Sequence, residues 1–209
     1  MPVNVIITGR SRSFPKDVPP MPGSGTVLAG TAAADVISGA AKAGLDFVAV
    51  ELNNECLGHH IGLDADPITA RIVGFARFRL GTADPSNLIE LVSMDWTDED
   101  AVAAAKAAFE GGGFVVACCA DRPGRIVNRL IRPYFNAVLR RLDDGLASAA
   151  DMDKTLMLGL GYPEGPNALL ARTGLADHHE VSAVLEGALG DNDFTPARRA
   201  QIAWQRASK

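Results

Sequence analysis

Short runs of apolar and β-branched residues alternate with glycine- and proline-rich loops over the first 120 residues of the chain. The runs are about four to eight residues long, which is the usual length of strands, and alanine-rich stretches of helical composition lie between some of them. Strands that alternate with helices are typical of an α/β layer with a mostly parallel sheet. The predicted strands are 3–8, 26–29, 46–51, 71–78, 87–94 and 114–117, and the predicted helices are 33–43 and 98–110.

Two of these segments carry a finer prediction. Thr97 is expected to cap the helix that follows it, because the acidic residues at 98–100 then occupy the first turn, where the helix dipole favours anions. The run 114–117 is continuously apolar, which is typical of a strand buried on both faces. Cys118 and Cys119 are therefore interpreted as small apolar residues on a buried strand.

The pattern changes after residue 120, where apolar residues recur at helical spacing almost to the end. Two neighbouring apolar stripes predict a long helix over 126–142 with a broad buried face, in which Pro133 should kink or interrupt the hydrogen-bond ladder. The stripes are Ile126, Leu130, Tyr134, Val138 and Leu142, and Val127, Ile131, Phe135 and Leu139. Further helices are predicted at 148–157, with Ser148 as the cap, and at 167–173, 177–189 and 196–206. The expected fold is an α/β domain at 1–119 followed by an all-α domain at 120–209.

Composition and charge exclude several classes of protein. The chain has 209 residues, a net charge of −5 and 47% hydrophobic residues, which are ordinary globular values and argue against a nucleic-acid or anionic-membrane partner. It lacks the run of roughly 18 apolar residues that a membrane span needs, and its N-terminus lacks the pattern of a secretory signal. Three cysteines, two of them adjacent, fit a reducing compartment. We therefore expect a cytoplasmic protein.

A dinucleotide-binding pattern, G-x-G-x-x-G between a strand and a helix, is matched only weakly. Near the strand 26–29, Leu28 stands at the first glycine position, Gly30 at the second and Ala33 at the third. Glu51 follows about 20 residues later at a strand end, where an acid would hold a ribose. Loss of the first glycine removes the tight turn, so the pattern favours a plain β-α-β packing unit. The histidine pairs at 59–60 and 178–179 lack further ligands at metal-binding spacing, so no metal site is expected.

More specific motifs lie at the start of the helical part. The segment 121–136 reads DRPGRIVNRLIRPYFN, and the segment 159–166 reads GLGYPEGP. They resemble the D-x-P-G-F-x-x-N-R, P-Y-x-N and G-x-G-x-P-x-G-P motifs of the C-terminal helical domain of the 3-hydroxyacyl-CoA dehydrogenases. Several dispersed motifs in the right order are more specific than one glycine pattern. Earlier segments at 53–57, 71–79 and 88–92 are similar to strands and a loop of the same family.

The resemblance implies a reduced Rossmann-like α/β domain before the helical domain, as in the second half of duplicated members of the family. The 120 residues before Asp121 are too few for the family's full nucleotide-binding domain. The helical domain forms the homodimer interface in the family, and the broad apolar face of the helix 126–142 agrees with that role.

The resemblance also implies a catalytic His–Glu dyad, in which the histidine takes the proton of the 3-hydroxyl group while hydride passes to NAD. Glu90 matches the glutamate, and Asn128 matches the polar residue at the start of the helical domain. These two are the candidate catalytic residues. The histidine position is Ala76, which cannot accept a proton, so the usual mechanism would need His59 or His60 to reach in from elsewhere.

Other departures from the family pattern lie nearby. The family's serine region reads Glu55-Cys56, and the asparagine after the histidine strand is Arg79. We therefore expect no cofactor in this chain, although the family uses NAD. Glu90 is interpreted as a residual acid with Arg77 or Arg79 as its partner.

Three arginines at i, i+4 and i+7 share one face of the predicted helix 126–142: Arg125, Arg129 and Arg132. They could contact the phosphates of an acyl-CoA, but a solvated helix face is the favoured interpretation.

Two hypotheses about function follow. In the first, the chain is a degenerate 3-hydroxyacyl-CoA dehydrogenase-family protein of fatty-acid or aromatic-acid breakdown that still binds acyl-CoA. In the second, it is a non-catalytic dimerisation or scaffold homologue that partners a complete dehydrogenase. In both, we expect a homodimer through the helical domain, and neither a nucleic acid nor a membrane as a partner.

Overall fold

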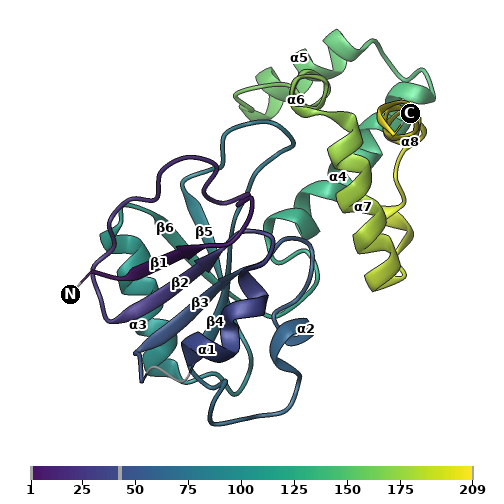
Figure 1. The fold of residues 1–209 in the computed structure, drawn as a ribbon. Coiled ribbons are helices and arrows are strands. Elements are labelled where there is room, and N and C mark those ends of the chain that lie inside the picture. Colours follow the sequence, from purple (N-terminus) through teal and green to yellow (C-terminus); the bar gives the residue numbers. More distant parts are fainter. Residues whose placement is uncertain (1, 42–43, 209) are drawn as a thin grey trace. The chain divides into compact units, whose positions relative to one another are not determined.

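The computed structural model describes residues 2–41 and 44–208, which form two compact units. The α/β unit comprises the described residues up to Arg79 together with Pro85–Ile126. The helical unit comprises Leu80–Asp84 and the described residues from Val127 onward. In Figure 1 the first unit runs from purple to teal, and the helices of the second run from green to yellow.

The α/β unit is built on a six-stranded sheet within the described residues, in the order β1-β2-β3-β4-β5-β6. Neighbouring strands pair in parallel except β4 and β5, which are antiparallel. The mostly parallel, Rossmann-like sheet predicted from the sequence is thus confirmed. The strands are β1 (Asn4–Ile7), β2 (Gly25–Ala29), β3 (Phe47–Glu51), β4 (Ile72–Arg77), β5 (Leu88–Ser93) and β6 (Val115–Ala120).

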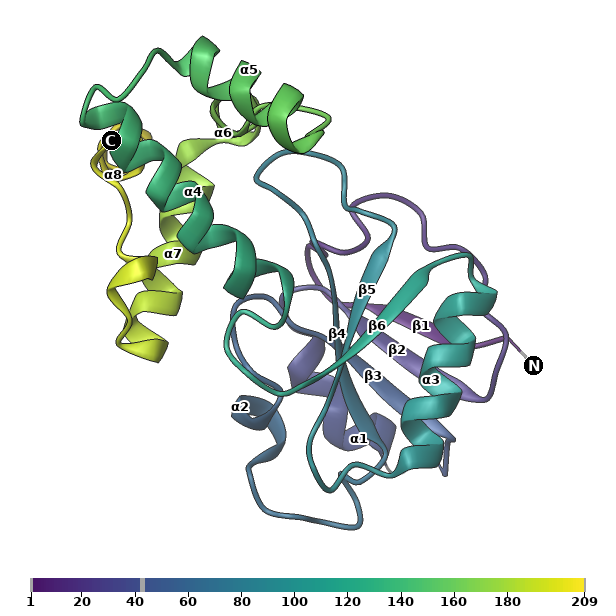
Figure 2. The same cartoon turned by 180° about the vertical axis from the view of Figure 1, so that it is seen from behind.

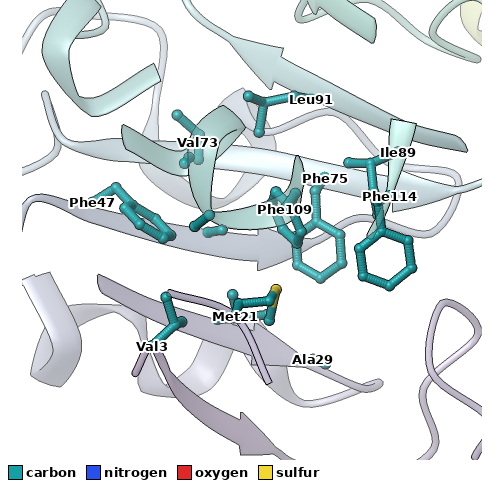
Figure 3. Close-up of a cluster of buried hydrophobic side chains, with 14 of the residues drawn as sticks. Val3, Met21, Ala29, Phe47, Val73, Phe75, Ile89, Leu91, Phe109 and Phe114 are labelled. Carbon is teal, nitrogen blue, oxygen red and sulfur yellow. The ribbon is translucent and has the colours of Figure 1, made fainter. Parts of the chain in front are cut away.

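Each face of the sheet packs on its own apolar cluster. On one face, Ala101, Ala105, Ala108 and Phe109 of α3 (Glu99–Gly111) join buried side chains of the strands. Figure 3 shows this cluster, and Figure 2 shows α3 lying across the sheet. The other face carries the short helices η1 (Ala33–Val36), α1 (Ile37–Ala41) and α2 (Gly58–Ile61), which pack on the remaining apolar residues of β2, β3, β4 and β5.

Three local predictions need correction. The helix expected at 33–43 is divided into η1 and α1, and positions 42 and 43 lie outside the described residues. Asp98, rather than Thr97, caps α3, because its side chain accepts the amide of Asp100. The strand expected to be buried on both faces is β6, at the edge of the sheet, where Cys118 is exposed. An apolar run alone does not tell an edge strand from a central one.

The helical unit consists of helices around a long central one, α4. Pro133 lies inside α4, and the helix continues through it. Ser148 caps α5 by accepting the amide of Asp151, as predicted. The elements are α4 (Val127–Asp143), α5 (Ala149–Leu160), α6 (Pro166–Thr173), α7 (Leu175–Leu189), η2 (Asn192–Phe194) and α8 (Arg198–Ala207).

Candidate functional site

Glu90 and Ala76 face each other across two antiparallel strands of the α/β unit. Glu90 on β5 is the cross-strand partner of Ala76 on β4, and both are buried. Directly opposite residues of an antiparallel pair carry their side chains on the same face of the sheet, close enough to touch. The two positions that the resemblance assigns to the dyad are therefore neighbours, and the one expected to hold the base carries a methyl group.

The Glu90 carboxylate is engaged by residues just before α4. Its Oε2 lies 3.3 Å from Nε of Arg125, and its Oε1 accepts the amide of Ile126 at 2.9 Å. Arg125 also donates from Nη2 to the carbonyl oxygen of Asn53 at 2.8 Å. Both charged side chains are almost fully buried, at 1% exposure for Glu90 and 7% for Arg125. Arg125 thus binds the buried carboxylate that would orient a catalytic histidine.

The position of Arg125 corrects two interpretations of the sequence. Arg125 precedes α4 and has a left-handed backbone with φ of 52°, so it does not share a helix face with Arg129 and Arg132. It is also the arginine that the structure pairs with Glu90, in place of the expected Arg77 or Arg79. Left-handed backbone is unfavourable for a residue with a Cβ, and here it brings the guanidinium onto the carboxylate.

Arg77 has a different role from the one expected. It is opposite Ile89, one position along from the Ala76–Glu90 pair, so its side chain points to the other face of the sheet. There its guanidinium lies 5.0 Å from the centre of the Phe114 ring and 5.7 Å from that of Phe14.

The loop after β3 holds the residues of the family's serine region. The carboxylate of Glu55 accepts the amide of Asn53 at 3.0 Å and lies 3.4 Å from Nε2 of His60. These contacts lower the pKa of Glu55 and outweigh its partial burial. His60 therefore pairs with Glu55, and His59 on the same short helix is exposed.

Asp121, the first residue of the motif that opens the helical part of the sequence, anchors this loop. Its carboxylate accepts the amides of Leu57 and Gly58 at 2.7 and 2.8 Å and so caps the start of α2. Burial together with the nearby carboxylates raises the pKa of Cys56, and it raises that of Cys119 to about 11. Both thiols therefore stay protonated at neutral pH, which argues against a nucleophilic role.

Asn128, the second candidate residue, belongs to the helical unit and is bound by Arg132. Nε of Arg132 donates to Oδ1 of Asn128 at 2.9 Å. The Arg132 side chain is 1% exposed, and Nη2 lies 3.7 Å from the Asp177 carboxylate. Arg132 is thus buried, contrary to the expected solvated face. Glu90 and Asn128 are in different units, and each is held by a buried arginine of its own unit.

His178 extends this buried network. Nη1 of Arg132 contacts Nδ1 of His178 at 3.2 Å, and Nε2 of His178 contacts Oδ1 of Asn136 at 2.9 Å. Because arginine only donates, Nδ1 must accept and Nε2 must carry the proton. Burial, together with the charge of Arg132, lowers the pKa of His178 to about 3. His178 is therefore neutral at physiological pH.

Acid should destabilise the helical unit through His178. Below about pH 6.5 the unfolded chain binds a proton at His178, whereas the folded unit does not until about pH 3, so stability is lost as the pH falls through this window. The expected slope from this residue is up to about 1.4 kcal/mol per pH unit. Urea unfolding of the wild type and of His178→Gln between about pH 7 and pH 4 measures it. Equal slopes in the two proteins would contradict the prediction.

The sequence contained a signal for this network that the apolar stripes obscured. A third stripe at the same spacing of four is polar and runs beside the other two on α4. Its members contact α7, η2 and the start of α8 rather than solvent. They are Asn128, Arg132, Asn136 and Arg140.

The described residues contain no group of three or more His, Cys, Asp and Glu side chains arranged to hold a metal ion. Among the described helices, none combines the length and the apolarity that crossing a membrane requires.

Comparison with known proteins finds a matching family model and several similar proteins. The model of the family described as 3-hydroxyacyl-CoA dehydrogenase, C-terminal domain, matches residues 124–208. A probable 3-hydroxyacyl-CoA dehydrogenase of Caenorhabditis elegans is 38% identical over 100 residues, which are 48% of this chain and 33% of that protein. The 3-hydroxybutyryl-CoA dehydrogenase of Mycobacterium tuberculosis is 39% identical over 89 residues, 42% of this chain and 31% of that protein. The matches thus span about a third of the length of these relatives.

Solved structures extend the similarity to the fold of the α/β unit. The (S)-3-hydroxybutyryl-CoA dehydrogenase from Ralstonia eutropha matches with a TM-score of 0.76 and 22% identity, over 88% of this chain and 66% of that one. The FadB2 protein of Mycobacterium tuberculosis matches with a TM-score of 0.70 and 24% identity, again over 88% and 66%. Residues 124–208 therefore match the C-terminal domain of the 3-hydroxyacyl-CoA dehydrogenases, and the α/β unit before them shares the Rossmann-type fold of the solved structures.

Proposed function

We propose that this protein binds acyl-CoA thioesters in fatty-acid or aromatic-acid breakdown in the cytoplasm, without oxidising them at its own α/β unit. One observation carries the proposal: the buried carboxylate of Glu90 is paired with Arg125, and the residue opposite Glu90 is Ala76. Oxidation of a 3-hydroxyacyl group needs a base that takes the hydroxyl proton as hydride leaves. Neither alanine nor a guanidinium can do this at neutral pH.

The glutamate is equally unsuited to replace the missing base. Its two oxygens accept from Arg125 and from the amide of Ile126, so both are held by the protein itself rather than presented to a substrate. Separating the ion pair would also cost much free energy, because it would leave a charge without a partner in the protein interior. The α/β unit therefore supports binding or packing rather than redox chemistry.

The side chain of Asn128 supports retained binding of a carbonyl ligand. Arg132 holds Oδ1 of Asn128, so the orientation of the carboxamide is fixed and Nδ2 is the group left to donate. Within the described residues Nδ2 has no hydrogen-bond partner from its own unit. An oriented amide donor suits the carbonyl oxygen of a 3-oxoacyl thioester, which accepts but cannot donate.

The surface of the helical unit favours a second function, that of a dimerisation or scaffold subunit. Leu158 and Leu160 on α5 are 78% and 65% exposed, and Met157 beside them is 40% exposed. A groove of about 560 Å³ between α5 and α6 is lined mainly by apolar atoms. An apolar surface of this kind favours association with a second copy or with a complete dehydrogenase.

Titration of the full chain with acetoacetyl-CoA, beside an NAD-reduction assay with 3-hydroxybutyryl-CoA, tests the proposal. We expect binding with a Kd on the order of 100 µM and no turnover above the background rate. Asn128→Asp keeps an acceptor for Arg132 but removes the amide donor, and it should weaken binding by about fivefold or more.

The matched control is Asn192→Asp, at an exposed position of η2 in the same unit, which should leave the affinity unchanged. Turnover at a rate normal for the family would contradict the proposal. Absence of acetoacetyl-CoA binding would leave the scaffold function, which sedimentation of the chain alone and with a complete dehydrogenase then tests.

A further inference from the structure

The order of the strands leaves no ordinary place for a dinucleotide. In open α/β sheets, ligands bind outside the carboxyl ends of the strands, at the point where the strand order reverses. Among the strands that the structure describes, the order runs from β1 to β6 without a reversal. A cofactor that the family uses would therefore need another opening at the carboxyl ends of β1, β2, β3 and β4.

The connection between β1 and β2 fills that edge with the chain's own residues. Ser11, Ser13 and Phe14 lie in this connection and are 4%, 1% and 4% exposed. The Phe14 ring packs 5.8 Å from that of Phe75 and 6.0 Å from that of Phe114, measured between centres. These three residues of the segment 11–14 are thus buried, and the segment is not a surface loop that a ligand could displace.

Glu51 at the end of β3 holds this segment in place. One oxygen of its carboxylate accepts the amide of Ser13 at 2.6 Å, and the other accepts the amide of Gly30 at 2.6 Å. Glu51 is 3% exposed. An acid that binds a ribose needs oxygens that the sugar hydroxyls can reach, and at this degree of burial they cannot. Both oxygens are instead engaged by the chain's own backbone, in short bonds that the charge of the carboxylate strengthens.

Arg77 at the end of β4 also binds this segment, through two hydrogen bonds to Ser13. Its Nη1 donates to the carbonyl oxygen of Ser13 at 2.8 Å, and its own amide donates to Oγ of Ser13 at 3.2 Å. With Glu51 on the amide of Ser13, all the polar groups of this residue have partners inside the unit.

Gly30, which matched the second glycine of the dinucleotide pattern, has a different use. Its backbone φ is 98°, and a Cβ at this position would lie 2.3 Å from the carbonyl oxygen of Thr8. Glycine is therefore required for the close approach of the chain after β2 to the end of β1. This contact with β1 is enough to explain the glycine, without a pyrophosphate beside it.

We infer that the segment 11–14 fills the space at the carboxyl ends of β1 to β4 where a dinucleotide would lie, and that Glu51 is the clamp that holds it there. The NAD of the family does not fit the residues present in this α/β unit. This inference concerns only the α/β unit and does not rest on acyl-CoA binding, so a negative acetoacetyl-CoA titration leaves it untouched.

Two measurements test the clamp. NADH titrated into the wild-type full chain and followed by its fluorescence should show no saturable binding up to about 1 mM. In Glu51→Gln, one of the two charge-assisted bonds is lost, and hydrogen exchange at the amides of Ser13 and Gly30 should accelerate by about tenfold or more at one or both. The control is Glu110→Gln, an exposed acid of α3, which should leave both amides protected.

Saturable binding of NADH by the wild type with a Kd below about 100 µM would overturn the inference. So would unchanged protection of both amides in Glu51→Gln, because Glu51 would then not be the clamp. If Glu51→Gln does not fold, the NADH titration of the wild type decides alone. Absence of NADH binding by the wild type then supports the inference, and saturable binding overturns it.

Discussion

Replacing Glu90 by glutamine is expected to lower the free energy of unfolding of the α/β unit by about 3 kcal/mol. The substitution removes the negative charge that faces Arg125, whose side chain is 7% exposed. A guanidinium cannot release its proton to escape burial, so its charge would remain in the interior without its carboxylate. Breaking one side of a buried ion pair is for this reason far more costly than losing an exposed one.

Urea unfolding measures the effect unit by unit, because each unit contains one of the two tryptophans, Trp96 and Trp204. In a Trp204→Phe background, fluorescence reports the α/β unit alone. The exposed pair of Glu110 with Lys106 supplies a control, since Glu110→Gln should change stability by less than about 0.5 kcal/mol. Combining Glu90→Gln with Arg125→Met should recover part of the loss. A Glu90→Gln protein as stable as the control would show that the ion pair is weak.

Replacing Arg132 by methionine should destabilise the helical unit by about 3–5 kcal/mol. Methionine preserves most of the volume of the aliphatic stem but removes the donor to two buried acceptors and the positive charge beside one carboxylate. The acceptors are Oδ1 of Asn128 and Nδ1 of His178, and the carboxylate is that of Asp177, which keeps the amide of Gly81 as a donor. Each buried acceptor left unsatisfied costs its own desolvation, and Asp177 loses the charge that faces it.

The matched control is Arg129→Met, because Arg129 lies on the same helix and is exposed. It should change the stability by less than about 0.5 kcal/mol. Fluorescence of Trp204 in a Trp96→Phe background follows the helical unit. If Arg132→Met and Arg129→Met unfold at the same urea concentration, Arg132 does not stabilise the network.

The sequence predicted the order of the elements well, because that order depends on local patterns. Alternating β-branched runs located the strands, and the stripes of apolar residues located α4. The opposition of Glu90 and Ala76 followed from motifs that carry a known arrangement of strands. The prediction that β6 is buried on both faces was wrong. The same apolar run suits an edge strand and a central one until its neighbours are known.

The contacts that define the candidate site depend on long-range packing instead. Arg125 and Glu90 are separated by 35 positions, and Arg132 and His178 by 46. Helical spacing predicted that Arg125 lies on a helix face. Its backbone is left-handed instead, and α4 begins only at Val127. Glu51 showed the spacing of a ribose-binding acid, and only its contacts with Ser13 and Gly30 reveal a different use. The sequence therefore shows which charged side chain stands at a position, but the residue to which it binds is known only from the fold.

The sequential strand order also has a consequence for how this sheet forms. Each strand pairs with the one immediately before it in the chain, so that Asn4 lies beside Thr26 and Leu88 beside Val115. A doubly wound sheet must instead insert later strands beside its first one, which closes longer loops and loses more chain entropy. Here each pairing closes only the segment between consecutive strands, which favours faster folding than a doubly wound order would. During synthesis, β1 to β4 can pair in turn as they leave the ribosome, without waiting for the residues that follow.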